Sequence, residues 1–153
     1  MRRKLRIAVL ILVVLGVGLQ FAPTAERDNP PSTAGLAMSD RVRTPPEVAA
    51  ILRRACYDCH SNETVWPWYS RVNPVAWFVI DHVHHARSHL NFSEWPTNVK
   101  KEPTPDQLLG GICTETREGF MPLGSYLLLH RAARLSAADV DTLCAWTKEV
   151  RGK

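Results

Sequence analysis

The chain has 153 residues, of which 45% are hydrophobic and 22% charged, a length and composition that suit one globular domain with a targeting segment. Its net charge of +4 comes from the four basic residues at positions 2–6, since from residue 7 onward 15 basic residues are matched by 15 acidic ones. A nucleic-acid-binding protein presents a basic face, so the neutral remainder of the chain argues against DNA or RNA as a partner.

The N-terminus has the layout of an export signal. Basic residues at positions 2–6 precede an apolar run at 7–21, IAVLILVVLGVGLQF. The run is short for a membrane span, but the sequence at 22–25 is a poor cleavage site, which favours an uncleaved anchor over a removed signal. We expect residues 1–22 to be this signal or anchor, with residues 7–21 in the inner membrane and the rest of the chain periplasmic or otherwise extracytoplasmic.

Residues 23–43 contain Pro23, Pro30, Pro31 and Gly35 among several charged residues. Because prolines hold a chain extended, this stretch is predicted to be a linker that lifts the following domain away from the membrane. The domain itself is expected at residues 44–153.

Four segments of the domain begin with a helix-start pattern and continue with apolar residues at helical spacing. They start near Thr44, Asn73, Thr104 and Ser136, and Gly119 is placed to end the third. No segment combines period-two alternation with turn signals at both ends. The sequence therefore predicts an all-α fold of about four helices joined by proline-rich loops.

The first of these helices runs into Cys56-Tyr57-Asp58-Cys59-His60, the C-x-x-C-H pattern of c-type haem attachment. Two thiols three positions apart at a helix end reach the two vinyl groups of one porphyrin, and the histidine that follows supplies an axial nitrogen to the iron. The pattern predicts one covalent haem c, attached through Cys56 and Cys59, with His60 as the proximal iron ligand.

Three other uses of these cysteines remain open on the pattern alone. A redox dithiol would accompany a βαβ pattern, which the sequence lacks. A zinc site would need two further ligands from the histidines. A disulfide between Cys56 and Cys59 would close a very tight loop.

The distal iron ligand is predicted to be Met121, in the loop between the third and fourth helices. A thioether is a soft ligand that raises the reduction potential relative to two histidines, although methionine also fills gaps in cores. His82 and His85, in the second helix, are reserve candidates for the distal position or for contact with a haem propionate. Trp66 and its aromatic neighbours pack either on the porphyrin edge or in the core.

Cys113 and Cys144 remain, each in a predicted helix. Outside the cytoplasm an even pair of cysteines is usually a disulfide, which here would close a loop of about 30 residues. The alternative is two buried free thiols.

Three runs of the sequence, in this order, closely resemble the haem-binding domain family of bacterial c-type cytochromes: ACYDCHSNETVWPWYSRVNPVAWFVIDHVHHARSHLNFSEW, EGFMPLGSYLLLH and LCAWT. The resemblance covers about residues 27–150. It implies an exported, cytochrome-c-like helical domain around a single covalent haem. The attachment motif, the Met-Pro element and the late cysteine pair of the family fall on Cys56, Cys59 and His60, on Met121 and Pro122, and on Cys113 and Cys144.

The first functional hypothesis is electron transfer to redox partner proteins by a haem held between His60 and Met121, in which case the protein is not an enzyme. The second is a haem enzyme or a gas or redox sensor, in which Met121 only packs and His82 or His85 acts on a bound peroxide or gas. The third is a zinc-binding module built from the C-x-x-C cysteines and histidines. Binding of carbon monoxide or cyanide separates the first two hypotheses, and metal analysis tests the third.

Overall fold

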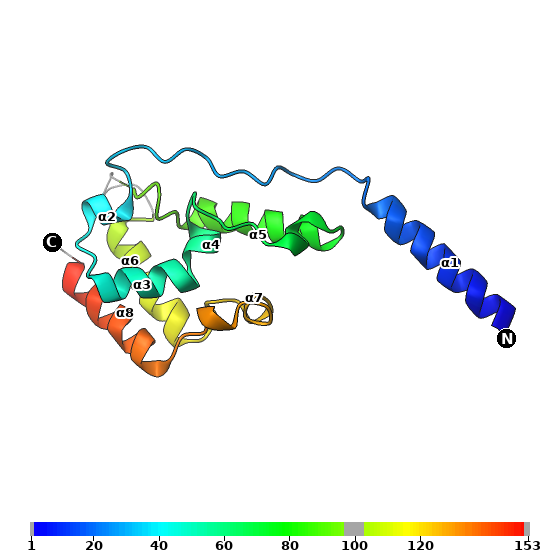
Figure 1. Ribbon diagram of the computed structural model, residues 1–153. Helices are drawn as coiled ribbons and strands as arrows, with labels where there is room; N and C mark the ends of the chain where they lie inside the picture. The colour runs from blue at the N-terminus through cyan, green and yellow to red at the C-terminus, as the bar shows by residue number, and fades with distance from the viewer. Residues whose placement is uncertain (1, 97–102, 152–153) are drawn as a thin grey trace.

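The computed structural model describes residues 2–96 and 103–151, and within these ranges the chain is helical and has no strand (Figure 1). The predicted all-α class is thereby confirmed. Its longer helices are α1 (Arg2–Leu19), α3 (Pro46–Ala55), α5 (Val75–His89), α6 (Pro105–Arg117) and α8 (Ala137–Val150). Between them lie the short helices α2 (Met38–Arg41), α4 (Tyr57–His60) and α7 (Gly124–Leu127), and the 3-10 turns η1 (Trp68–Arg71) and η2 (Arg131–Ala133).

Helices α3, α5, α6 and α8 are the four that the sequence predicts, and two of them start with the expected cap. At Thr104 and Ser136 the cap side chain accepts a backbone hydrogen bond from the third helical residue, whose own side chain accepts one from the cap. The other two starts differ from the prediction. Thr44 Oγ1 donates to the Val42 carbonyl, and the Asn73 side chain donates to carbonyls at and beyond the end of α1. There the prolines that follow preset the helical φ without a side-chain cap.

The hydrophobic core lies where α3, α6 and α8 meet, at the left of Figure 1. Leu52, Leu109 and Leu143, one from each helix, are between 0% and 2% exposed. Trp146 of α8 is also buried, and its indole N–H donates to the Arg43 carbonyl at 2.9 Å, which satisfies the polar end of the ring. Each such side chain contributes roughly 1.5–3 kcal/mol by its burial, so the helix that leads into the C-x-x-C-H motif is firmly held.

A disulfide between Cys113 and Cys144 joins α6 to α8, with the Cα atoms 4.7 Å apart and a sequence separation of 31. Of the two alternatives that the sequence leaves for these cysteines, the structure contains the covalent pair. The bond ties two of the three core helices together.

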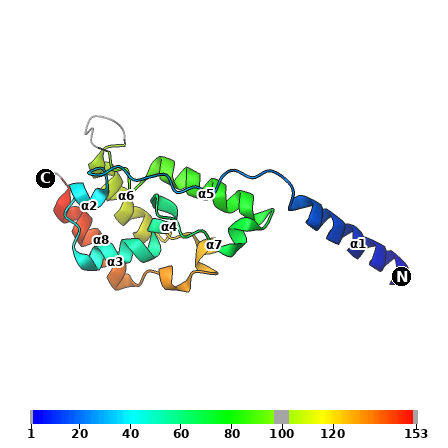
Figure 2. The same cartoon turned by 45° about the horizontal axis from the view of Figure 1, so that its top comes forward.

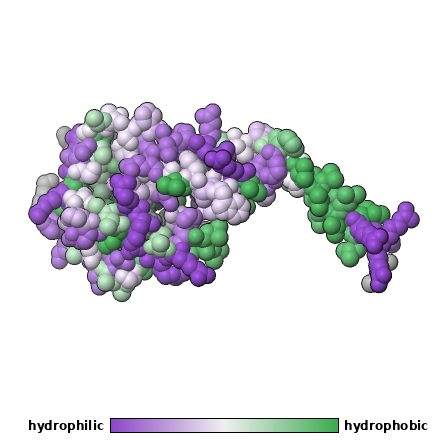
Figure 3. Space-filling model, viewed as in Figure 1, coloured by the Kyte–Doolittle hydropathy of each residue, from purple (hydrophilic) through white to green (hydrophobic). Residues whose placement is uncertain are grey.

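Helix α1 projects from the rest of the chain, and none of its residues is buried (Figure 1). Its apolar side chains are exposed, as the continuous apolar stretch of this helix in Figure 3 shows. Within residues 2–96 and 103–151, no helix is both long enough and apolar enough to cross a membrane.

Residues 23–43, predicted to be a linker that separates the domain from a membrane, are bonded to the domain instead. Trp77 Nε1 donates to the Pro23 carbonyl, Arg27 to the Ser70 carbonyl, and the Asn29 side chain to the carbonyl of Thr64. The extended chain runs beside α5 (Figures 1 and 2). At its end Met38 is 1% exposed and belongs to the core. Prolines keep the backbone extended, but its free carbonyls still accept hydrogen bonds from the domain.

Replacing the disulfide by Cys113→Ala with Cys144→Ala is expected to lower the free energy of unfolding by about 2–5 kcal/mol, because the unfolded chain is no longer cross-linked. Denaturant titration of the purified protein measures this difference. Wild-type protein treated with a reductant serves as the control and should lose a similar amount. An unchanged midpoint in the double variant would show that the cross-link contributes nothing to stability.

Asp139 is expected to make stability fall between about pH 4 and pH 2. It accepts hydrogen bonds from Ser136 and pairs with Arg54 at 2.7 Å, and these contacts lower the pKa of Asp139 from 3.8 to about 2. A depressed folded-state pKa stabilises the fold above the unfolded value, and this stabilisation is lost as pH falls through the folded value. Unfolding midpoints across this range should vary less with pH in Asp139→Asn than in the matched control Asp141→Asn; equal slopes would contradict the assignment.

Candidate functional site

The predicted attachment motif forms a single tight turn. Cys56 ends α3, where its N–H donates to the Leu52 carbonyl at 2.8 Å. The N–H groups of Cys59 and His60 both donate back to the Cys56 carbonyl, at 3.1 and 2.9 Å. Residues 56–60, called the attachment turn below, therefore carry two thiols and one imidazole within one helical turn.

The imidazole of His60 is held in one tautomer. Its Nδ1 lies 3.1 Å from the Leu90 carbonyl oxygen, and because a carbonyl only accepts hydrogen bonds, Nδ1 must carry the proton. Burial lowers the pKa of His60, an effect that hydrogen bonds to backbone carbonyls oppose. The ring is therefore neutral, with the lone pair of Nε2 free to bind a metal.

Residues 90–95 hold this histidine in place. Besides the Leu90 carbonyl, the Phe92 N–H donates to the His60 carbonyl at 2.7 Å, and the Asn62 N–H donates to Ser93 Oγ at 3.0 Å. The Phe92 ring lies parallel to that of Tyr57, with centroids 5.2 Å apart. Residues 90–95, LNFSEW, thus orient the His60 ring, as partners of metal-binding histidines generally do.

Arg87 secures the chain that leaves the attachment turn. Its guanidinium donates to the Ser61 carbonyl at 2.7 Å, to Thr64 Oγ1 at 2.8 Å and to Asn29 Oδ1 at 2.9 Å. Its side chain is only 8% exposed, with Asp28 as a charge partner. Motif spacing does not single out Arg87, and its one signal in the sequence is its place inside an otherwise histidine-rich helix.

The two motif cysteines are free thiols in the structure. Burial raises the pKa of Cys56 to about 12 and that of Cys59 to about 11, so both are protonated at neutral pH. A reactive dithiol needs a lowered pKa. In the part of the chain that the structure describes, no three His, Cys, Asp or Glu side chains gather in a way that could hold a metal ion. The dithiol and zinc alternatives therefore have no support in this geometry.

Met121 follows directly on the end of α6. Gly119 has a φ of +77°, and beyond it the N–H groups of Phe120 and Met121 both donate to the Glu115 carbonyl, at 3.0 and 3.1 Å. A glycine in the left-handed region is the usual helix stop, as the sequence predicts. This cap fixes the backbone of Met121 and leaves its side chain half-buried.

The chain after Met121 reaches the attachment turn. Tyr126 of α7 donates its hydroxyl to Asp58 Oδ2 at 2.7 Å, and Asp58 lies between the two motif cysteines. The rings of Tyr126 and His130 stack with centroids 4.0 Å apart. Burial, followed by the bond to Asp58, raises the pKa of Tyr126, so the hydroxyl stays protonated and remains a donor. Asp58 and Tyr126 are the other site residues that motif spacing did not reveal.

The reserve histidines make contacts only within α5, as far as the described residues show. His82 Nδ1 donates to the Phe78 carbonyl at 2.9 Å, and its ring lies over the Phe78 ring. His85 is exposed and contacts the ring of His89. Neither ring is bonded to the attachment turn.

The residues around the turn suit a flat apolar group that carries carboxylates, as haem does. Large apolar side chains remain 45–75% exposed in two stretches that follow the turn in the sequence: Val65, Trp68, Val75 and Phe78, and Phe120, Leu128 and Leu129. Figure 3 shows part of this surface as an apolar patch over α7 and the chain after it. Trp66 Nε1 is a buried donor without a partner in the described residues, placed six positions after His60. A carboxylate such as a propionate would satisfy it.

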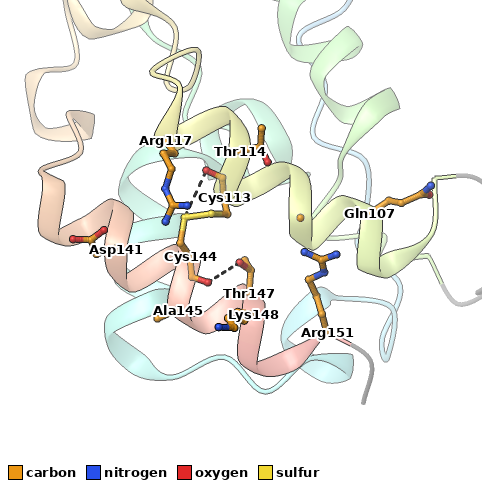
Figure 4. Close-up of a pocket in the computed structure, with 11 residues that line it drawn as sticks. Gln107, Cys113, Thr114, Arg117, Asp141, Cys144, Ala145, Thr147, Lys148 and Arg151 are labelled. Carbon is orange, nitrogen blue, oxygen red and sulfur yellow. Dashed lines mark hydrogen bonds between the residues drawn. A yellow bond between two sulfur atoms is a disulfide. The ribbon is translucent and has the colours of Figure 1, made fainter.

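A groove of about 730 Å³ lies between α6 and α8 (Figure 4). The disulfide lies in its floor, and Arg117, Lys148 and Arg151 stand around it. No residue of the attachment turn lines it, and its polar rim does not suit a porphyrin. The site is therefore identified by its donor atoms and not by the size of a cavity.

A model of the family described as a haem-binding domain matches residues 14–149, which is most of the chain. The match spans the attachment turn, residues 90–95, Met121 and both disulfide cysteines. No curated protein and no solved structure matches the chain. On the strength of the family match, this chain belongs to the haem-binding domain family.

Proposed function

We propose that this protein is a monohaem c-type cytochrome with a cytochrome-c-like domain, which transfers single electrons to redox partner proteins outside the cytoplasm. The observation that carries the proposal is the attachment turn: Cys56, Cys59 and His60 on one helical turn, with His60 held so that Nε2 is free. Family membership supports haem binding. The covalent link and the single haem rest on the two thiols of this turn.

In this proposal each thiol of the turn adds to one vinyl group and becomes a thioether. When bound, the haem supplies an iron that alternates between the ferric and ferrous states. The protein supplies the axial nitrogen through His60, and the Leu90 carbonyl and Phe92 keep that ring from rotating. The exposed apolar side chains of residues 65–78 and 120–129 would pack against the porphyrin and exclude water.

Met121 is proposed as the second axial ligand. Its backbone is fixed by the α6 cap, and the chain that follows is bonded to Asp58, so the segment is tied to the attachment turn that would hold the haem. A filled distal position suits an electron carrier, because the iron changes charge without binding a substrate. The local contacts of His82 and His85 on α5 give no support to the alternative of a haem enzyme or sensor that uses them.

The location outside the cytoplasm is also part of the proposal. It is supported by the basic residues and apolar run of α1, which have the order of an export signal. The expected inner-membrane anchor at residues 7–21 has no such support, because no helix of the described residues is long and apolar enough to cross a membrane. The disulfide between α6 and α8 adds support, because such bonds persist in oxidising compartments.

Haem is expected to remain on the chain in a denaturing gel, and Cys56→Ala with Cys59→Ala should abolish the haem stain because no thioether can form. The protein is to be expressed with its N-terminal segment and a cytochrome maturation system, and the stain followed in cytoplasmic, periplasmic and membrane fractions. The control Cys113→Ala with Cys144→Ala removes the same number of cysteines, those of the disulfide, and should keep the stain. A wild-type protein that is exported without bound haem would end the proposal.

Met121→Leu is expected to remove the sulfur-to-iron band from the ferric absorption spectrum and to speed carbon monoxide binding, because the leucine side chain has no donor atom for iron. Met38→Leu is the matched control, since Met38 is 1% exposed in the hydrophobic core and is not a proposed ligand. If the band persists in Met121→Leu, another residue is the ligand. Rapid carbon monoxide binding by the wild-type protein would favour the enzyme or sensor instead.

A further inference from the structure

We propose that the hydrogen bond from Tyr126 to Asp58 is a latch that holds residues 119–130, called the Met121 segment below, against the attachment turn and so keeps Met121 on the iron. The inference rests on the proposed function, since it concerns how the distal ligand of that site is held. Tyr126 acts here as a positioning residue and does not itself touch the iron.

The acceptor end of the latch is rigid. Asp58 Oδ2 accepts the Tyr126 hydroxyl at 2.7 Å, while Oδ1 accepts the Val65 N–H at 3.1 Å and the Asp58 carbonyl accepts Thr64 Oγ1 at 2.8 Å. The carboxylate is thus fixed in orientation by its own neighbours. A hydroxyl bonded to an ionised acceptor is among the stronger hydrogen bonds of proteins.

The donor end is braced within the Met121 segment. The Tyr126 ring stacks on the His130 ring at a centroid distance of 4.0 Å and an angle of 7°. His130 Nδ1 in turn donates to the Tyr126 carbonyl at 3.2 Å. These contacts limit the rotation of the phenol, so the hydroxyl is presented to Asp58 with little loss of side-chain entropy.

The segment has little else to hold it against the turn. None of the residues of α7 is buried, and Phe120, Leu128 and Leu129 are 61%, 75% and 64% exposed. Its remaining anchors lie outside the turn: the Glu115 carbonyl at its start, and Tyr69, whose hydroxyl lies 3.4 Å from His130 Nδ1. Just beyond its end, the carbonyls of Ala132 and Arg134 accept hydrogen bonds from Arg54. Within residues 2–96 and 103–151, the Tyr126–Asp58 bond is the one hydrogen bond that joins the Met121 segment to the attachment turn.

As a consequence, occupation of the distal position by Met121 depends on the Tyr126–Asp58 hydrogen bond. A segment with few buried contacts opens locally at low free energy. Tyr126 is five positions from Met121. Because an extended chain spans at most about 3.6 Å per residue, the latch and the ligand stay close to each other. Opening of the latch frees the Met121 segment to move, and the distal position becomes accessible to small ligands.

Tyr126→Phe in the haem-loaded full chain tests the latch, because it removes the hydroxyl and keeps the stacked ring. We expect ferrous carbon monoxide binding to become roughly tenfold faster, the factor that corresponds to about 1.4 kcal/mol, with a weaker sulfur-to-iron band in the ferric form. Amide hydrogen exchange at residues 119–130 should rise in parallel. Asp58→Ala, which also removes the acceptor of the Val65 N–H, should give at least these effects. Adding Tyr126→Phe to Asp58→Ala should change nothing further, because the latch is then already absent.

Tyr69→Phe is the matched control: its hydroxyl lies 3.4 Å from His130 Nδ1 but does not reach Asp58, so this variant should bind carbon monoxide at the wild-type rate. A wild-type sulfur band and rate in Tyr126→Phe would overturn the latch while leaving the proposed function standing. If the wild-type protein itself lacks the band and binds carbon monoxide rapidly, Met121 is not the ligand, and the latch fails together with that part of the proposed function. Unchanged amide exchange at 119–130 counts against the latch whatever the ligand.

Discussion

The hydrogen bond between His60 Nδ1 and the Leu90 carbonyl decides what the attachment turn can do. A free imidazole exchanges its proton between two nitrogens and rotates about its side-chain bonds, so neither the nitrogen that carries the lone pair nor the direction of that lone pair is fixed. The Leu90 carbonyl accepts only from Nδ1, so it fixes both the tautomer and the ring orientation. In the proposed function the thiols of Cys56 and Cys59 provide attachment, but the direction in which the lone pair of Nε2 points depends on this one carbonyl.

The rest of the fold supports that contact from two sides. The core of α3, α6 and α8, with its disulfide, holds the helix that ends at Cys56. Leu90 follows directly on the C-terminal end of helix α5. Arg87, near the end of that helix, donates hydrogen bonds both to the chain leaving His60 and to the extended residues 23–37, called the strap below. Since α5 is joined to both the turn and the strap, residues 23–37 act as part of the site's support and not as a spacer.

The contrast in packing across the molecule follows from its size. A chain of 153 residues buries a limited core, and here that core is concentrated in the helices around Leu52, Leu109 and Leu143. The stretches at residues 65–78 and 120–129 instead leave large apolar side chains exposed. A porphyrin would supply the missing apolar surface, which explains how a small domain keeps a stable site with few buried side chains of its own.

Short-range patterns were enough to predict the four longer helices of the domain, the C-x-x-C-H motif and the helix end at Gly119. Capping, helical periodicity and thiol spacing all depend on residues within a few positions of one another. Thr104 and Ser136 cap as expected, whereas Thr44 and Asn73 do not, since tertiary partners compete for their side chains. By contrast, the contacts of His60 with Leu90, of Arg87 with Thr64 and of Asp58 with Tyr126 join residues from 23 to 68 positions apart. Such contacts carry no spacing signal along the chain, so the orientation of the histidine, the strap along α5 and the bond that holds the Met121 segment emerge only when the helices are packed together.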